Sequence, residues 1–575
     1  MAADSISDPY RLDLRVIQET LRSGRATEVW LESWLPSTHT APERFQDMLR
    51  SFVATRRDAP VKGRDDHGFD LYHDLVAAHV GRKRVAFVAY DESGSVVPTS
   101  YDALQTRSNG LAAAWTEAGV EVGQVVAIVA PVSVDYLAAL VTAFRLGLVA
   151  APVALAGPAL VRSRLLALQP HWVTASARQR SAIPLSYAAL PLSAPPRVSG
   201  PSTSHAYDAD QVALRLLSPF APPSNALSDL TAKTVHDSAL RDGALVFALR
   251  SDDVLAAPGF DVSQHQPALL LGSLACGAAF AELAPASLAE DPVEKAIEKA
   301  VDKTGVTVLG LTGASRELLL GRSVDLLRSP VRAWFRSLTE VLEGDRWDAL
   351  YRLGPAKRIP GFAVVSCAAS GGVLLASPPT SEAPSLRMWP VPGLPWQLSE
   401  SVEGAVPALA GAGIFTLLVG EDADPSVPRV AFSRSGSALL YGGSLEVGRD
   451  AQRYPIEQLE EAACTHPEVR HAAAIAVGGR HINDARVVLL AFTEGLRGER
   501  PIPLRELEEI ILRELGERFR PDRIEVFPLR PRIQKTGAID RAWCRSQYLG
   551  GVMSRKARSE IFVSLGRLGY LFEKH

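Results

Sequence analysis

The side chains that could act as nucleophiles or metal ligands do not stand at the spacings that their chemistry requires. The cysteines form no CxxC pair, and three histidines, His466, His471 and His481, cluster around a turn at His466-Pro467. Metal sites need closely spaced ligands, so we expect no metal here and thiols that are buried in a reducing compartment. G-x-S-x-G, H-E-x-x-H and Walker-type phosphate motifs are also missing. The cysteines are Cys276, Cys367, Cys464 and Cys544.

The composition excludes some classes of binding partner but says little about catalytic activity. The chain has 575 residues, 47% hydrophobic residues and a formal net charge of −3, which gives no electrostatic reason to bind nucleic acid or acidic membranes. Its polar, acidic start does not resemble a secretory signal. Two apolar stretches, Ala268–Phe280 and Val406–Gly420, are too short to span a bilayer and are expected in the core. We expect a cytoplasmic protein without a membrane span.

The elements that would position a site alternate between strands and helices in the first part of the chain. Tyr101–Ala118 has the apolar spacing of an amphipathic helix. Val125–Val153 reads as strand, helix and strand, with Ser133 as the N-cap and Gly147 ending the helix. Such a crossover predicts a parallel sheet covered by helices.

The pattern changes after about residue 450, where we expect a compact α+β unit. Residues 377–402 contain six prolines and are expected to form a loop or linker. The predicted order in the last unit is helix 456–464, strands 472–477 and 486–492, helix 504–518, strand 523–527 and a helix from about 539 to 548. The predicted domains are a helical extension (1–60), a large α/β domain (61–445), a small α+β domain (446–550) and a tail (551–575).

Three stretches in this order resemble the adenylate-forming superfamily, which includes acyl-CoA synthetases, fatty-acyl-AMP ligases and peptide-synthetase adenylation domains. They are residues 99–153, 454–478 and KTGAIDRAWCRSQYLGG (535–551), whose ending is similar to fatty-acyl-AMP ligases. The resemblance implies a large N-terminal domain with parallel-rich sheets covered by helices, and a small C-terminal α+β domain. It also implies a reaction that joins a carboxylate to ATP with Mg²⁺ and often passes the acyl group to a thiol, as in acyl-CoA.

The family's phosphate loop is poorly matched. The resemblance aligns it with residues 218–233, with Ser218 at its start, Lys233 at its end and His236 in the T-x-H segment that begins the next helix. A phosphate cradle needs small residues whose backbone N–H groups close on the anion. This loop has no glycine, and three prolines each remove an N–H donor. A lone Lys233 is more often simply solvated.

Other ATP-handling positions are matched only in part. Ser370, Gly371 and Gly372 align with the family's turn beside the adenine, although an ordinary tight turn after a buried strand explains them equally well. The family's Y-G-x-T-E metal-binding segment is missing, and residues 428–443 contain no acidic residue for the ribose. Barely twenty residues separate Gly372 from the linker at Pro390 and Pro392, which suggests a deletion.

The last motif lacks its catalytic lysine. Ala538 occupies that position, and Lys535 lies three residues earlier. A flexible lysine stem would let Lys535 substitute, but a surface lysine ahead of a helix is the simpler interpretation. Arg541 keeps the basic residue that follows the motif.

Because four ATP-handling elements are altered together, the first hypothesis is a pseudoenzyme that binds an acyl or carboxylate ligand, an acyl carrier protein or a genuine ligase. The second is an active ligase with relocated groups such as Lys233 and Lys535, and the third is an ATP-independent enzyme that acts on acyl thioesters. ATP with Mg²⁺, or acyl-CoA, would be a cofactor only if the protein is active.

Overall fold

The computed structural model describes most of the chain from Pro42 onwards. The described residues are 42–65, 68–90, 95–153, 157–200, 203–217, 227–260, 265, 268–283, 304–322, 330–337, 344–353, 359–367, 371–377, 387–391, 396–399, 414–419, 430–435, 438–444, 448–449, 452–453, 456–477, 486–493, 504–533 and 539–555.

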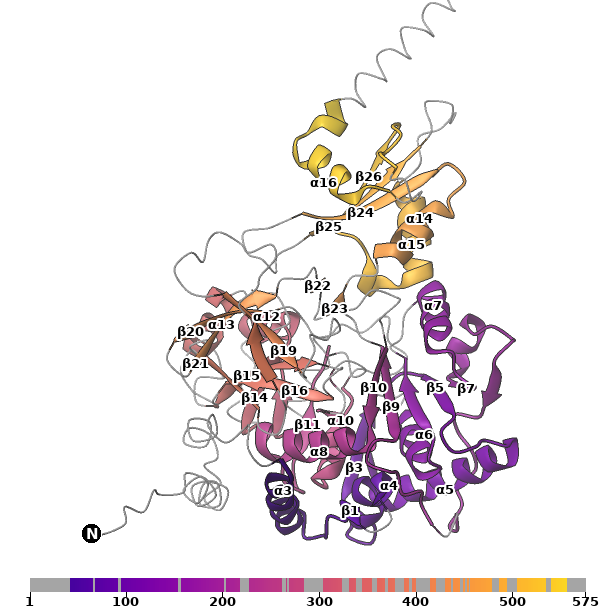
Figure 1. Ribbon diagram of the computed structural model, residues 1–575, viewed down its shortest axis with the longest axis vertical. Coiled ribbons are helices and arrows are strands. Elements are labelled where there is room, and N and C mark those ends of the chain that lie inside the picture. The colour runs from indigo at the N-terminus through magenta and orange to yellow at the C-terminus, as the bar shows by residue number, and fades with distance from the viewer. Residues whose placement is uncertain are drawn as a thin grey trace, which may run out of the picture.

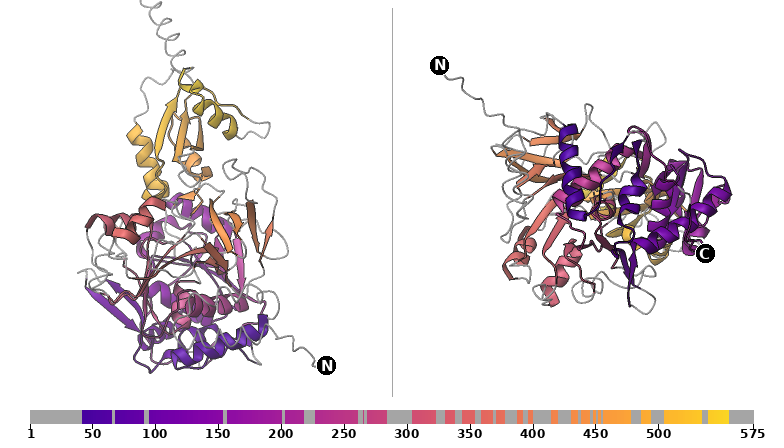
Figure 2. Two further views of the ribbon diagram at one scale, coloured as in Figure 1. Left: turned by 90° about the vertical axis from the view of Figure 1, so that its left-hand side faces the viewer. Right: turned by 90° about the horizontal axis from the view of Figure 1, so that it is seen from below.

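The larger part of the molecule contains two sheets covered by helices (Figures 1 and 2). The first has six strands in the order β10-β9-β6-β5-β7-β8, and all its neighbours are parallel except β9 and β10. This confirms the expected parallel sheet. The strands are β5 (Val125–Val129), β6 (Val149–Pro152), β7 (Trp172–Ala175), β8 (Ala188–Leu190), β9 (Val212–Leu217) and β10 (Leu227–Thr231).

The first crossover forms where the sequence predicts it. The Ser133 side chain accepts a hydrogen bond from Tyr136 N at 3.2 Å and starts helix α6 (Val134–Arg145). Gly147 follows the helix with φ +72°, a left-handed conformation that glycine adopts without a Cβ penalty. Local capping thus fixes both ends of α6.

Helix α5 (Tyr101–Ala118) has the predicted bounds and the predicted apolar face. Leu104, Leu111 and Trp115 are buried, and the Trp115 indole N–H donates to Pro191 O at 2.9 Å. A buried indole needs such an acceptor. Helix α7 (Pro158–Leu168) then leads into β7.

The second sheet has thirteen strands, and its middle is parallel. Its order is β18-β19-β20-β21-β17-β16-β15-β14-β13-β11-β12-β3-β4, with parallel pairing from β15 through β12 to β3. The parallel strands are β3 (Val85–Tyr90), β11 (Val254–Ala256), β12 (Ala279–Ala281), β13 (Val308–Gly310), β14 (Ala333–Ser337) and β15 (Gly361–Cys367). The others are β4 (Val96–Ser100), β16 (Gly372–Ala376), β17 (Arg387–Pro390), β18 (Trp396–Ser399), β19 (Ile414–Val419), β20 (Val430–Ser435) and β21 (Ala438–Ser444).

The loop expected over residues 377–402 is wrong in part, because β17 and β18 lie within it. Pro390 is the last residue of β17, opposite Leu375 of β16. Proline removes one ladder N–H but is tolerated at a strand end, so a proline-rich composition does not prevent short strands.

Further helices cover these sheets, and the N-terminal helix α3 (Pro42–Arg57) joins them. Leu49 and Val53 of α3 are buried in the same apolar core as helices α6 and α8. The apolar stretch at 268–280 is buried, as expected. The other helical segments are α4 (Leu71–Leu75), η1 (Ala77–His79), η2 (Ala177–Ala182), α8 (Ala232–Arg241), η4 (Asp242–Val246), α10 (Leu270–Ala275), α12 (Gly313–Arg322) and α13 (Gly344–Leu353). The short pairs are β1 (Arg64–Asp65) with β2 (Gly68–Phe69) and β22 (Gly448–Arg449) with β23 (Gln452–Arg453).

The C-terminal part forms a three-stranded sheet between two layers of helices (Figure 1). Helices α14 (Ile456–Cys464) and α15 (Leu504–Leu515) cover one face, and α16 (Arg541–Leu549) covers the other. The predicted strands are confirmed within one residue, as β24 (His471–Val477), β25 (Arg486–Phe492) and β26 (Arg523–Phe527), with η9 (Glu517–Phe519) before the last. Successive residues of β24, such as Ala472 and Ala473, face opposite cores.

Among the described residues, none of the helices combines the length and the apolar character that crossing a membrane requires.

Candidate functional site

The segment aligned with the phosphate loop, residues 218–233, includes strand β10 and the first residues of helix α8. β9 ends at Leu217 and pairs antiparallel with β10, which begins at Leu227 directly opposite. Helix α8 follows at once, capped by Thr231, whose side chain accepts from Thr234 N at 3.2 Å. The loop itself, including Ser218, lies outside the described residues. The whole of β10 therefore lies between Leu227 and the first residue of α8, Ala232, and the two loop ends, Leu217 and Leu227, are at the end of the strand pair opposite to the helix.

Lys233 lies in the first turn of α8 and forms an ion pair within the same helix. Its Nζ is 2.5 Å from Asp237 Oδ2, one turn further along, and about half of the lysine side chain (48%) is exposed. The charge of Lys233 is therefore already opposed by a carboxylate in this structure. A phosphate at Lys233 would have to share the ammonium, which has three N–H donors, with Asp237.

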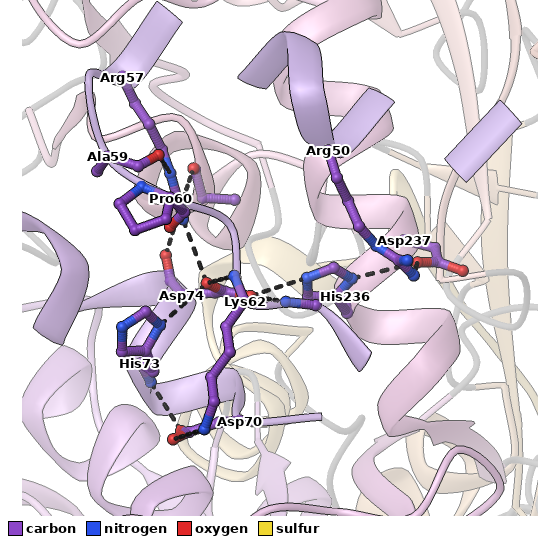
Figure 3. A network of polar contacts seen from close by, with 12 residues as sticks. Arg50, Arg57, Ala59, Pro60, Lys62, Asp70, His73, Asp74, His236 and Asp237 are labelled. Atoms are coloured by element: carbon purple, nitrogen blue, oxygen red, sulfur yellow. Dashed lines mark hydrogen bonds and ion pairs between the residues drawn. The ribbon is translucent and has the colours of Figure 1, made fainter. Parts of the chain in front are cut away.

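His236 points away from solvent and lies between two carboxylates (Figure 3). Its Nε2 is 3.1 Å from Asp74 Oδ2 and its Nδ1 is 3.2 Å from Asp237 Oδ1. Carboxylates only accept hydrogen bonds, so both ring nitrogens must donate, which requires the imidazolium form. Burial opposes that charge, but the hydrogen bonds and charges of Asp237 and Asp74 raise the pKa of His236 above its ordinary value.

Asp74, in α4, accepts hydrogen bonds from several neighbouring donors. Its carboxylate accepts from the backbone N–H groups of Lys62 and Gly63, each at 2.8 Å, and from the Arg57 guanidinium at 3.2 Å. The pKa of Asp74 would be raised by burial, yet the hydrogen bonds of His236 and His73 and the charges of His236 and Arg57 lower it well below its ordinary value. Asp74 is thus an ionised carboxylate in the interior.

Arg57 connects this network to the N-terminal helix. The guanidinium is completely buried and donates to the carbonyl oxygens of Ala59, Asp74 and Ala275 at 3.2, 2.8 and 2.9 Å, and also to that of Pro60. Figure 3 shows the same group beside Asp74, with Arg50 of α3 approaching Asp237 at 3.7 Å. The network therefore ties α3 and α4 to α8.

The arrangement is suited to holding elements together rather than to transferring protons or binding metal. Every acid in it is matched by a buried base, and burial leaves no room for substrate at His236. Within the described part of the chain, no group of three or more His, Cys, Asp or Glu residues could hold a metal ion. The sequence pointed to His236 but missed Asp74 and Arg57, because no motif connects residues so far apart.

The glycine turn after β15 is pressed against α8 and η4. Gly371 has φ +77°, and a Cβ there would lie 3.0 Å from Thr234 Cγ2. A Cβ on Gly372 would lie only 2.0 Å from Asp242 Oδ2. The space beside these glycines is therefore filled by the protein's own side chains. Ser370 lies outside the described residues.

Asp242 fixes this turn from inside. Its carboxylate accepts from Val373 N at 2.8 Å and from Arg241 Nε at 2.7 Å. Burial raises the pKa of Asp242, although Arg241 acts in the opposite direction. Sequence reasoning missed Asp242; the signal that could have found it is the adjacent Arg241-Asp242 pair at the end of a helix.

Helix α16, which begins at Arg541 in the small domain, lies far from α8 (Figure 1). The Arg541 guanidinium binds Glu460 of α14 in bidentate fashion, with Nε and Nη2 at 2.8 and 2.7 Å from the two carboxylate oxygens. Glu460 also accepts from Ala474 N at 2.8 Å. Arg541 thus connects α16, α14 and the edge strand β24. Lys535 and Ala538 lie outside the described residues.

Comparisons with known proteins identify the fold. Residues 76–166, which include β3, α5, β5, α6 and β6, match the family model for AMP-binding enzymes. No curated protein matches the chain. Among solved structures, the amide bond synthetase McbA from Marinactinospora thermotolerans is similar with a TM-score of 0.62 and 16% identity, over 84% of this chain and 100% of that chain.

Two other structures give a similar picture. An artificially fused adenylation-PCP di-domain, NpsA-ThdA from Klebsiella oxytoca, has a TM-score of 0.60 and 15% identity, over 79% of this chain and 93% of that one. The o-succinylbenzoate CoA synthetase of Bacillus subtilis has a TM-score of 0.60 and 13% identity, over 82% and 97%. At these identities the likeness shows the fold alone.

Proposed function

We propose that this chain, which has the adenylate-forming fold and a first βαβ segment that matches AMP-binding enzymes, is a pseudoenzyme of that superfamily. It keeps the fold in order to bind an acyl or carboxylate ligand, an acyl carrier protein or a genuine ligase. In this proposal it does not form acyl adenylates, and it acts in the cytoplasm.

The observation that carries the proposal is that each described candidate for nucleotide handling is engaged by the chain itself. Lys233 pairs with Asp237, His236 lies between Asp74 and Asp237, and Arg541 is bound by Glu460. A site that binds ATP needs donors directed at the phosphates and free to meet them. Here the same donors hold helices in place.

The glycine turn supports the same conclusion. An adenine ring could contact Gly371 and Gly372 only on a side where other atoms of the protein do not already touch them. At the position that a Cβ would take on each glycine, the nearest atoms belong to Thr234 for Gly371 and to Asp242 for Gly372. The space that the missing side chains leave is therefore filled by α8 and η4.

The sequence removes the remaining groups that the reaction needs. Ala538 replaces the catalytic lysine, residues 428–443 have no acid for the ribose, and no Y-G-x-T-E segment supplies a carboxylate for Mg²⁺. Each such group contributes several kcal/mol in a working enzyme (roughly 2.7–4 kcal/mol for a single oxyanion-type donor). The joint loss is therefore expected to abolish the reaction.

The similar structures suggest the classes of ligand and partner. These structures are an adenylation domain fused to a PCP, a CoA synthetase and an amide bond synthetase. We infer for this chain a carboxylate or acyl ligand, or a carrier protein that presents one. The fold supports this only as an analogy, since one fold hosts many functions.

The experiment is pyrophosphate exchange into ATP, measured with saturating Mg²⁺ and a panel of long-chain and aromatic carboxylates. We expect no carboxylate-dependent exchange by the wild-type protein, and none by Lys535→Ala or Lys233→Ala. A known ligase under the same conditions provides the positive control. Exchange above background that disappears in Lys535→Ala would contradict the proposal and favour an active ligase with relocated groups.

The third hypothesis, chemistry on acyl thioesters without ATP, is tested with the same protein preparation. Acyl-CoA is incubated with the chain in the absence of nucleotide, and free thiol is measured. We expect no release above the uncatalysed rate. Turnover of the thioester would replace the pseudoenzyme by an ATP-independent enzyme.

A further inference from the structure

Helix α7 of the large domain has a second apolar contact besides its own sheet. Val161, Leu165 and Leu168 pack against β5, β6 and β7. Leu160, in contrast, is part of the core of the small domain, where it is packed with residues of α14 and α15 such as Leu459 and Ile511. One short helix thus contributes to two hydrophobic cores.

The backbones of the two domains are in direct contact next to this side chain. The Gly157 N–H donates to Leu515 O across the interface at 2.8 Å. A Cβ on Gly157 would lie 2.1 Å from the backbone carbon and oxygen of Glu514. Only glycine allows this approach, because such a distance is far inside van der Waals contact.

Polar pairs extend the contact on both sides. Arg162 Nη2 lies 3.5 Å from Glu514 Oε2, and Gln458 Nε2 donates to Ser163 Oγ at 3.2 Å. The contact therefore combines a buried leucine, a backbone hydrogen bond, an ion pair and a side-chain hydrogen bond. Figure 1 shows α7 against the end of α15, between the two domains.

This contact determines which face of the small sheet is turned toward the large domain. Helices α14 and α15 cover the face toward α7, and α16 covers the opposite face. Ile533 and Ile539, which flank residues 534–538, form a β-bridge, and Ile539 packs on the α16 side.

We propose that the contact of Gly157 and Leu160 with α15 is an interdomain lock that holds the small domain in this one orientation. While the lock is closed, the two domains move as one body. The lock stands on interdomain geometry, so it holds whether or not the chain is a pseudoenzyme.

Hydrogen–deuterium exchange of the full-length protein tests the lock. The first amides of a helix have no partner within that helix, so the Gly157 amide owes its protection to Leu515. We expect slow exchange at Gly157 in the wild-type protein, also after addition of Mg²⁺-ATP and dodecanoate. Leu160→Ser is expected to accelerate it at least about tenfold, since it replaces the leucine that packs into the small-domain core.

The control is Leu166→Ser, the same substitution on the same helix at a side chain that is 72% exposed, against 5% for Leu160. It is expected to leave exchange at Gly157 unchanged, and α6 should stay protected in both variants. Gly157→Ala provides a second opening variant, with Gly313→Ala as its control because a Cβ at Gly313 meets nothing within 4 Å.

Three results would overturn the lock. The first is a Gly157 amide that exchanges in the wild-type protein as fast as an unprotected amide. The second is slow exchange that persists in both Leu160→Ser and Gly157→Ala. The third is loss of protection on adding Mg²⁺-ATP and dodecanoate, which would make the contact one of two states that the ligands select.

Discussion

At the scale of single residues, the main polar feature of the large domain's interior is the network of buried charges around His236. Acidic groups from α4 and α8, Asp74 and Asp237, face the imidazole, with Arg57, Lys233 and Arg50 further out. Breaking such a set is costly, because the partner left behind stays buried without compensation.

The stability that His236 provides is expected to depend on pH. Because the pKa of His236 is raised above 6.5, its contribution is complete below pH 6.5 and is lost as the pH rises through the folded pKa. The pKa values of Asp74 and Asp237 are lowered below 3.8, so their contribution is present above pH 3.8 and is lost as the pH falls through their folded pKa values. The network should therefore stabilise most between pH 3.8 and 6.5.

Urea denaturation of the wild-type protein and of His236→Gln across this range measures the effect. The difference in the free energy of unfolding should be largest in that window and decrease at alkaline pH. A difference that stays constant from about pH 5 to about pH 10 would show that the imidazolium form is not what stabilises the fold.

Asp74→Asn is expected to reduce the free energy of unfolding by about 3–5 kcal/mol, because Arg57 and His236 lose their shared counter-charge in the interior. The matched control is Asp229→Asn, which removes a carboxylate from the partly exposed Arg215–Asp229 pair. That pair should contribute less than about 1 kcal/mol. Equal losses in the two variants, measured by chemical denaturation, would contradict the account of Asp74 as the centre of the network.

At the scale of elements, local signals in the sequence were sufficient for most helices and strands. The N-cap at Ser133 and the glycine at 147 fixed α6, and continuous runs of small and apolar residues are typical of buried strands such as β24 and β25. The strands β17 and β18 were missed, because their stability comes from pairing with strands such as β16 and β19 and not from their own sequence.

The glycine turn gives a prediction at this scale. Gly372→Ala would place a methyl group 2.0 Å from the Asp242 carboxylate, which also holds Val373 N. We expect a loss of about 1–3 kcal/mol in the free energy of unfolding, typical of overpacking in a core. Gly313→Ala, where a Cβ meets nothing within 4 Å, should change it by less than about 0.5 kcal/mol. A neutral Gly372→Ala would mean that the turn has space for a ligand.

At the scale of the whole molecule, the body plan was predictable and the candidate site only partly so. The order of elements anticipates both the parallel sheets and the small α+β domain, because each depends on local periodicity. The buried network joins residues 57, 74 and 236 from three separate elements. Only the folded topology brings them together, so no spacing in the sequence could reveal Asp74 and Arg57 as partners of His236.

The central claim is that the fold persists without the means to hold ATP. Thermal unfolding of the purified chain with and without Mg²⁺-ATP tests it most directly, since a ligand present at 100 times its Kd adds about 2.7 kcal/mol to the free energy of unfolding. We predict that the Tm does not change at millimolar Mg²⁺-ATP. A Tm that rises with the concentration of Mg²⁺-ATP, and not with that of a control anion such as sulfate, would contradict the account.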